Sequence, residues 1–235
     1  LILQYLKYYE EAAACFEYLT KFFPSREMYN NYGVSKLSQA LNYKQQEAVS
    51  FIYPIEIDAS SRIYSHTERG DDTLNRENRF KELVRDAKIA FEKAISLDPK
   101  YVKSYINLAC LYDIRGNYQA ALGVINEVEG LGSVNTDLEL IKAIALYHSK
   151  NINKADSILQ KISTTGNVLY EYNSKLLSSA IVTNGDNQAI EKWKDDWVMN
   201  RVLISGDTCN SQYKMLGNFI KGADITQMQN INEAL

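Results

Sequence analysis

The sequence has little of the chemistry that catalytic and metal sites require. Its 235 residues include two histidines, and neither has a carboxylate or a cysteine at metal-ligand spacing. Three widely spaced cysteines, Cys15, Cys110 and Cys209, exclude a full disulfide framework and a CxxC site. Three cysteines still allow one disulfide, but buried or unreactive thiols are the simpler interpretation. Phosphate-binding glycine loops, nucleophile elbows and HExxH motifs are absent. We therefore expect no enzymatic activity, no metal and no cofactor.

The sequence also lacks a block of one charge and a long apolar run. Its Lys, Arg, Asp and Glu residues are interspersed and give a net charge of −3. Nucleic-acid binding depends largely on basic patches that neutralise phosphates, so we expect no nucleic-acid partner. No apolar run approaches the ~18–20 residues of a membrane helix, and we expect no membrane span. The chain has no leader-like start and does not begin with Met. We expect a processed form of a longer chain that is soluble, either cytoplasmic or exported.

What the sequence does contain is a regular period, in which similar stretches recur about every 34 residues. Four alanines follow it, each with a large apolar residue four positions later: Ala87 with Phe91, Ala121 with Ile125, Ala155 with Leu159, and Ala189 with Trp193. Ala109 and Ala143, in two of the intervening stretches, are separated by the same interval. Small residues let antiparallel helices approach closely, and large residues one turn away fill the space beside that contact. We expect Ala87, Ala109, Ala121 and Ala143 to be buried at helix crossings.

This pattern resembles the tetratricopeptide repeat (TPR) family. Its first-helix signature, W-x2-L-G-x2-Y, is approximated by Tyr105, Leu108, Ala109 and Tyr112. Its second-helix signature, A-x3-F followed by P, matches Ala87, Phe91 and Pro99. The resemblance implies an all-α fold, a right-handed α-solenoid of antiparallel helix pairs in which each repeat packs on its neighbours. The expected helices include Phe80–Leu97, Lys103–Arg115, Tyr118–Glu129, Asp137–Ser149 and Lys154–Ile162.

The period also divides the chain into repeats of a single solenoid over residues 1–235. Residues 1–25 are the second helix of a first repeat, and 26–99 form a repeat with an insertion at about 43–78. Residues 100–133 and 134–167 are regular repeats, 168–201 a divergent repeat, and 205–235 capping helices. The insertion follows from the spacing of Ala12 and Ala87, which is much longer than the one period expected between second helices of successive repeats.

The insertion contains the stretch SFIYPIEIDASSRIY, Ser50 to Tyr64, which is unlike its helical surroundings. Pro54 is incompatible with a helix interior, so this stretch is expected to be extended or irregular. In an extended chain one face carries Phe51, Tyr53, Ile55 and Ile57, and the other carries Ile52, Pro54, Glu56 and Asp58. We expect the first four to pack on the solenoid's own helices, as an extended segment or a hairpin with 62–64, with HTERGDD an exposed loop. The open alternative is that their apolar face awaits a partner strand or peptide.

The TPR resemblance further implies a concave groove, lined by the first helix of each repeat, that binds peptides. The residues at these positions are Asn30, Asn31, Val34, Lys103, Ile106, Asn107, Cys110, Asp113, Ile114, Leu140, Ile141, Ile144, Tyr147 and His148. Some family members use Lys and Arg there to hold a chaperone's C-terminal carboxylate. Asn107 matches one position of that clamp, whereas Asp137 and Ile141 replace basic residues. A carboxylate needs cations, so we do not expect that partner.

The sequence therefore predicts a non-catalytic protein–protein interaction scaffold. It would bind a peptide or partner protein, of a kind that the sequence does not specify, through the concave groove. The alternative is a regulatory or sensory TPR segment of a larger enzyme or receptor whose other domain lies outside this chain.

Overall fold

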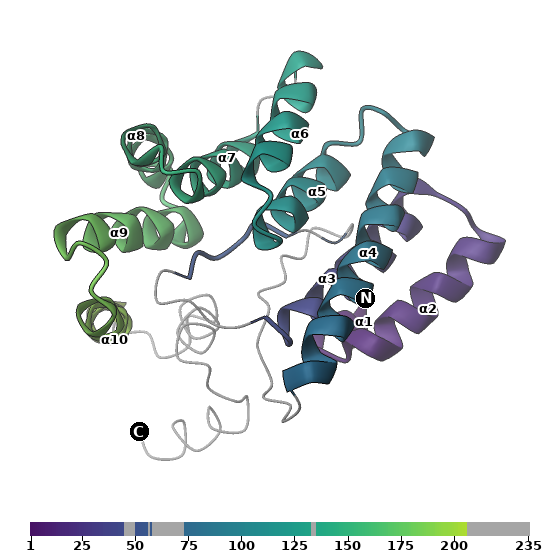
Figure 1. Ribbon diagram of the computed structural model, residues 1–235, viewed down its shortest axis with the longest axis horizontal. Helices are drawn as coiled ribbons and strands as arrows, with labels where there is room; N and C mark the ends of the chain where they lie inside the picture. Colours follow the sequence, from purple (N-terminus) through teal and green to yellow (C-terminus); the bar gives the residue numbers. More distant parts are fainter. Residues whose placement is uncertain (45–49, 56, 58–72, 133–134, 206–235) are drawn as a thin grey trace. The chain divides into compact units, whose positions relative to one another are not determined.

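A computed structural model describes residues 1–44, 50–55, 57, 73–132 and 135–205. All regular secondary structure within these ranges is helical (Figure 1). The helices are α1 (Ile2–Tyr5), α2 (Tyr9–Phe22), α3 (Arg26–Leu41), α4 (Thr73–Leu97), α5 (Val102–Ile114), α6 (Tyr118–Gly130), α7 (Thr136–His148), α8 (Ile152–Ser163), α9 (Val168–Val182) and α10 (Asn187–Ser205). The predicted all-α class is confirmed for the described part of the chain. The C-terminal capping helices predicted for 205–235 lie almost entirely outside it.

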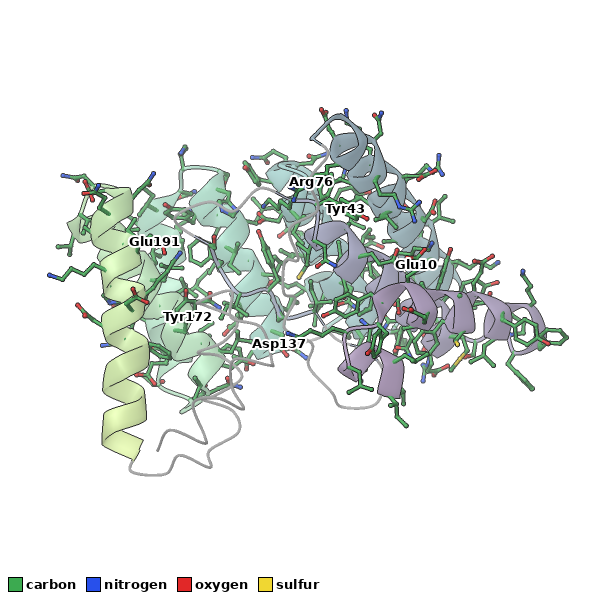
Figure 2. All side chains as sticks on the ribbon, turned by 90° about the horizontal axis from the view of Figure 1, so that it is seen from below. Glu10, Tyr43, Arg76, Asp137, Tyr172 and Glu191 are labelled. Carbon is green, nitrogen blue, oxygen red and sulfur yellow. The ribbon has the colours of Figure 1, made fainter. Side chains whose placement is uncertain are left out.

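Four of the five helices predicted in detail begin and end within two residues of the prediction. The fifth, α4, begins at Thr73 rather than Phe80, so its predicted start was wrong. The extra turns carry no apolar period that would indicate a helix. Arg76 lies in these turns and donates a hydrogen bond from Nη2 to the carbonyl oxygen of Asn42 at 3.3 Å. Figure 2 shows Arg76 beside Tyr43, just beyond the end of α3. A tertiary contact thus accompanies the extension.

The chain divides into two compact units, and each is described by itself. The first consists of residues 1–45 and 53–158, and the second of residues 46–52 and 159–235. The boundary falls within α8, between Ile158 and Leu159. A single solenoid running through residues 1–235 therefore stays a prediction.

In the first unit each helix from α2 to α7 packs against the next along the chain. The contacts α3 with α5 and α5 with α7 join the first helices of successive repeats. This is the packing expected of a repeat protein, in which a helix pair contacts only its neighbours (Figure 1). The side chains of Ser25, Asn117 and Asn135 cap α3, α6 and α7 by accepting backbone N–H hydrogen bonds in the first turn.

The alanines of the period occupy the core. Ala87, Ala109, Ala121 and Ala143 are all 0% exposed, which confirms their predicted burial. Ala189 of α10, the last alanine of the series that begins with Ala87, differs. It is only half-buried, and the next residue, Ile190, is fully buried. In α10 the buried position thus lies one residue after the one that the period predicts. In α9 the residue one period after Ala143 is the large Leu177.

The insertion has no strand structure where it is described. Phe51, Ile55 and Ile57 are buried and Tyr53 is half-buried. Ile52 and Pro54, expected on the opposite face, are buried as well. Burial therefore does not distinguish the two faces assigned to this stretch, as expected where the backbone is irregular and lacks the two-residue period of a pleated strand. The hairpin partner at 62–64 and the loop HTERGDD lie outside the described residues.

Candidate functional site

The residues predicted to line the groove come together on three helices of the first unit. They lie on α3, α5 and α7, and α5 is in contact with both of the others. On α5 they repeat at intervals of three and four residues, so they occupy one face of that helix. We call the fourteen predicted residues the groove face.

Most of the groove face is covered. Its buried members are Asn30, Asn31, Val34, Ile106, Asn107, Cys110, Asp113, Ile114, Leu140, Ile141 and Ile144, none more than 4% exposed. Lys103, Tyr147 and His148 are partly exposed. Asp137, at a position where the chaperone clamp is basic, is buried as well. Whether the face binds a partner stays a prediction.

One buried polar cluster joins α3 to α5. Asn30 Oδ1 accepts hydrogen bonds from Ser104 Oγ at 2.9 Å and from Asn107 Nδ2 at 3.0 Å. All three residues are 0% exposed. Buried amides are costly unless hydrogen-bonded, so these contacts stabilise the pairing of the two helices. The amide of Asn107, the position that matches the chaperone clamp, is thus engaged within the protein.

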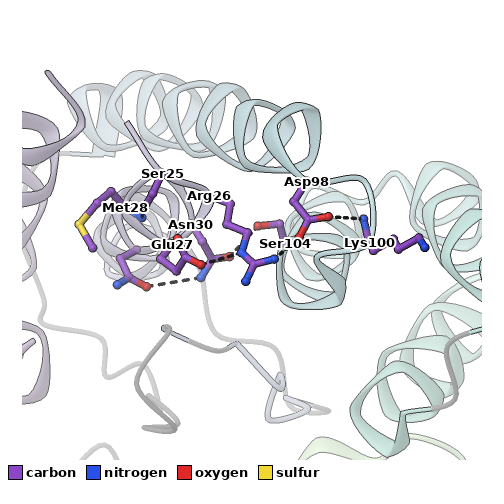
Figure 3. A network of polar contacts seen from close by, with 9 residues as sticks. Ser25, Arg26, Glu27, Met28, Asn30, Asp98, Lys100 and Ser104 are labelled. Atoms are coloured by element: carbon purple, nitrogen blue, oxygen red, sulfur yellow. Dashed lines mark hydrogen bonds and ion pairs between the residues drawn. The ribbon is translucent and has the colours of Figure 1, made fainter. Parts of the chain in front are cut away.

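A partly exposed ionic cluster lies at the start of α3, next to this amide cluster (Figure 3). The Arg26 guanidinium pairs with Glu27 and Asp98 and lies over the ring of Tyr101, 4.9 Å from its centroid. The backbone N–H of Lys100 and the Arg26 guanidinium hold the pKa of Asp98 below its ordinary value. The hydrogen bond from Arg26 likewise lowers the pKa of Glu27. These contacts fasten the end of α4 to α3 and have the character of a structural brace.

The second buried cluster joins α5, α7 and the insertion. Tyr53 Oη donates a hydrogen bond to Asp113 Oδ2 at 2.8 Å, and His148 Nδ1 lies 2.8 Å from the same oxygen. Asp113 is 1% exposed. Its other oxygen, Oδ1, is buried and has no hydrogen-bond partner among the described residues. Sequence reasoning placed Asp113 and His148 in one groove. It did not identify Tyr53 as their partner, because nothing local marks a contact across 60 residues.

In the second unit an asparagine holds the backbone of the insertion. Asn173 of α9 accepts a hydrogen bond at Oδ1 from the N–H of Ile52 at 2.9 Å. Its Nδ2 donates to the carbonyl oxygen of Ile52 at 3.0 Å. The fully buried amide thus satisfies both the N–H and the carbonyl group of one residue of the insertion. Sequence reasoning missed Asn173; the only signal was an asparagine in a largely apolar helix, where its propensity is low.

The rest of the second unit is built around aromatic packing. The ring of Tyr172 on α9 lies 5.8 Å from that of Trp193 and 5.3 Å from that of Trp197 on α10, between centroids. Tyr172 is 1% exposed, and burial raises the pKa of its phenol. The arrangement is that of a core in which α9 packs on α10.

The described residues contain no group of three or more His, Cys, Asp or Glu side chains that could hold a metal ion. No helix in the described ranges has both the length and the apolar character needed to cross a membrane.

One stretch of the chain matches a known protein family. A family model described as tetratricopeptide repeat matches residues 90–123, which span the last third of α4, all of α5 and the first half of α6. This match supports the tetratricopeptide repeat resemblance found in the sequence, over these residues. No curated protein and no solved structure matches the chain.

Proposed function

We propose that this chain is a non-catalytic scaffold that binds a peptide or a segment of another protein along the groove face. The observation that carries the proposal is the hydrogen bond between Tyr53 and Asp113. Tyr53 belongs to a non-helical segment, whereas Asp113 belongs to the groove face. This contact supports a face that accommodates extended polypeptide. The tetratricopeptide repeat at 90–123 supports the same class of function, because such repeats generally act as interaction modules.

The composition of the groove face suits peptide binding. Ile114 and Ile144 would supply apolar area and Asp113 a polar group to a partner that gains access to this covered face. Binding sites commonly combine an apolar surface with a few polar groups that fix the orientation of the ligand. Tyr147 is partly exposed on this face, and tyrosine is enriched among residues that dominate binding energy.

The proposal is tested by affinity capture with the intact chain, comparing two tyrosine variants. Tyr147→Ala removes an aromatic side chain from the groove face. Tyr18→Ala removes one from α2, where Tyr18 is 61% exposed and lies outside that face. We expect any protein captured by the parent to be depleted with Tyr147→Ala and retained with Tyr18→Ala. Equal retention by both variants, or equal loss from both, places the binding surface elsewhere.

A further inference from the structure

We propose that residues 53–55 and 57 are an internal ligand of the groove face, held by Tyr53, and that a partner binds by displacing them. This inference rests on the proposed function and adds how the site is regulated and what chemistry its partner presents. The partner is an extended peptide that places a hydrogen-bond donor on Asp113 and apolar side chains beside it.

The first support is the character of the segment. Pro54, Ile55 and Ile57 are buried, yet residues 53–55 and 57 belong to no helix or strand. A proline-containing, non-helical segment with apolar side chains has the character of a bound peptide rather than of a repeat helix. The segment also has no place in the period of the repeats, because it lies within the excess length that separates Ala12 from Ala87.

The second support is the hydrogen-bonding capacity left on Asp113. Tyr53 Oη and His148 Nδ1 both lie on Oδ2, while the buried Oδ1 has no partner among the described residues. A carboxylate can accept hydrogen bonds at both oxygens, and a buried acceptor without a donor is unfavourable. The Tyr53 hydroxyl therefore does not saturate the carboxylate. A competing side chain with a donor can replace that hydroxyl.

A third feature makes the covering of the face measurable. Cys110 lies on α5, one turn before Asp113 and on the same face, and is 0% exposed. Because the thiol is buried, we expect it to react with a labelling reagent when that face opens. In a chain that also carries Cys15→Ser and Cys209→Ser, the labelling rate of Cys110 reports this opening.

The deciding experiment compares Tyr53→Phe with Ile125→Val in that background. Tyr53→Phe removes only the hydroxyl, and Ile125→Val weakens the core of α6, away from the groove face. We expect Tyr53→Phe to speed the labelling of Cys110 about tenfold, as loss of a hydrogen bond to a charged group would. This increase should exceed the change that the substitution causes in the global unfolding equilibrium, measured by urea denaturation. The labelling rate itself should depend little on the urea concentration. For Ile125→Val the two changes should match. If they also match for Tyr53→Phe, the segment is ordinary core and the inference is overturned.

A peptide supplied in trans tests the ligand character separately. A fluorescent peptide of sequence SFIYPIEI should bind Tyr53→Ala more tightly than the parent, and its phenylalanine analogue SFIFPIEI should bind less tightly. Equal binding to parent and variant overturns the displacement step. Loss of capture in the Tyr147→Ala test without any change in these two measurements would sink this inference and leave the proposed function standing. If Tyr53→Phe speeds the labelling of Cys110 as expected but Tyr147→Ala captures as much protein as the parent does, the proposed binding surface is wrong. The contact of the segment with the groove face would then still stand.

Discussion

Gly33 of α3 lies directly against the aromatic ring of Phe91 of α4. A Cβ atom built on Gly33 would come within 2.5 Å of Cε1 and 2.7 Å of Cδ1 of that ring. Phe91 is 0% exposed and cannot swing into solvent. The absence of a side chain at Gly33 is therefore what lets α3 and α4 pack closely around the ring.

Gly33→Ala should consequently destabilise the protein. We expect the free energy of unfolding to fall by about 1–3 kcal/mol, the usual effect of overpacking a core, although alanine favours a helix more than glycine does. Urea denaturation measures this. The same substitution at Gly123 of α6 is the control, since no heavy atom lies within 4 Å of its added Cβ. There the change should stabilise by about 0.5–1 kcal/mol. A gain at both positions would contradict the packing described for Gly33.

Ala109→Leu tests the repeat register. Ala109 is 0% exposed at the crossing of α5 with its neighbours, so three extra carbon atoms have no space there. We expect a loss of about 1–3 kcal/mol in the free energy of unfolding. Ala14→Leu, on the exposed side of α2, should change stability by no more than about 0.5 kcal/mol. Thermal unfolding of Ala109→Leu that coincides with that of the parent would show the register to be wrong.

Phe51→Asp distinguishes a structural insertion from one that awaits a partner. Phe51 is 4% exposed, and the substitution removes a large apolar group and places a carboxylate in the space. Truncating a buried phenylalanine costs about 3–5 kcal/mol, so the melting temperature should fall markedly. Phe22→Asp, on a residue 59% exposed at the end of α2, should leave it nearly unchanged. Unchanged stability of Phe51→Asp together with lost partner binding would favour an insertion whose apolar face awaits a partner strand or peptide.

Acidification should release the brace between α3 and α4. The pKa of Asp98 is held below its ordinary value of 3.8 by the N–H of Lys100 and by Arg26. A depressed pKa stabilises the fold above 3.8, and that contribution disappears as the pH falls through the folded-state pKa. Asp98→Asn should thus lower the melting temperature at pH 7, and the difference should shrink below pH 3.8. In an Arg26→Gln background part of the difference should persist, because the N–H of Lys100 remains. A difference that stays constant with pH would rule out this linkage.

The sequence by itself determined the features that repeat. The periodic spacing of small and large apolar residues predicted the bounds of four helices to within two residues, and the burial of Ala87, Ala109, Ala121 and Ala143. It could do so because helix pairing within a repeat depends on residues that are close in the sequence. One periodic face of each helix must be buried, and small residues must lie where helices cross.

The tertiary structure alone decided the features that do not repeat. The early start of α4 accompanies a contact between Arg76 and Asn42. In α10 the fully buried residue is Ile190 and not Ala189, which the period predicts. Tyr53 meets Asp113 across 60 residues, and Asn173 meets Ile52 across 121. A single polar side chain carries no periodic signal, and its partner depends on where the folded chain places distant segments. The predicted groove residues were therefore found by their position on the helices, whereas the segment that contacts Asp113 could be found only in the folded chain.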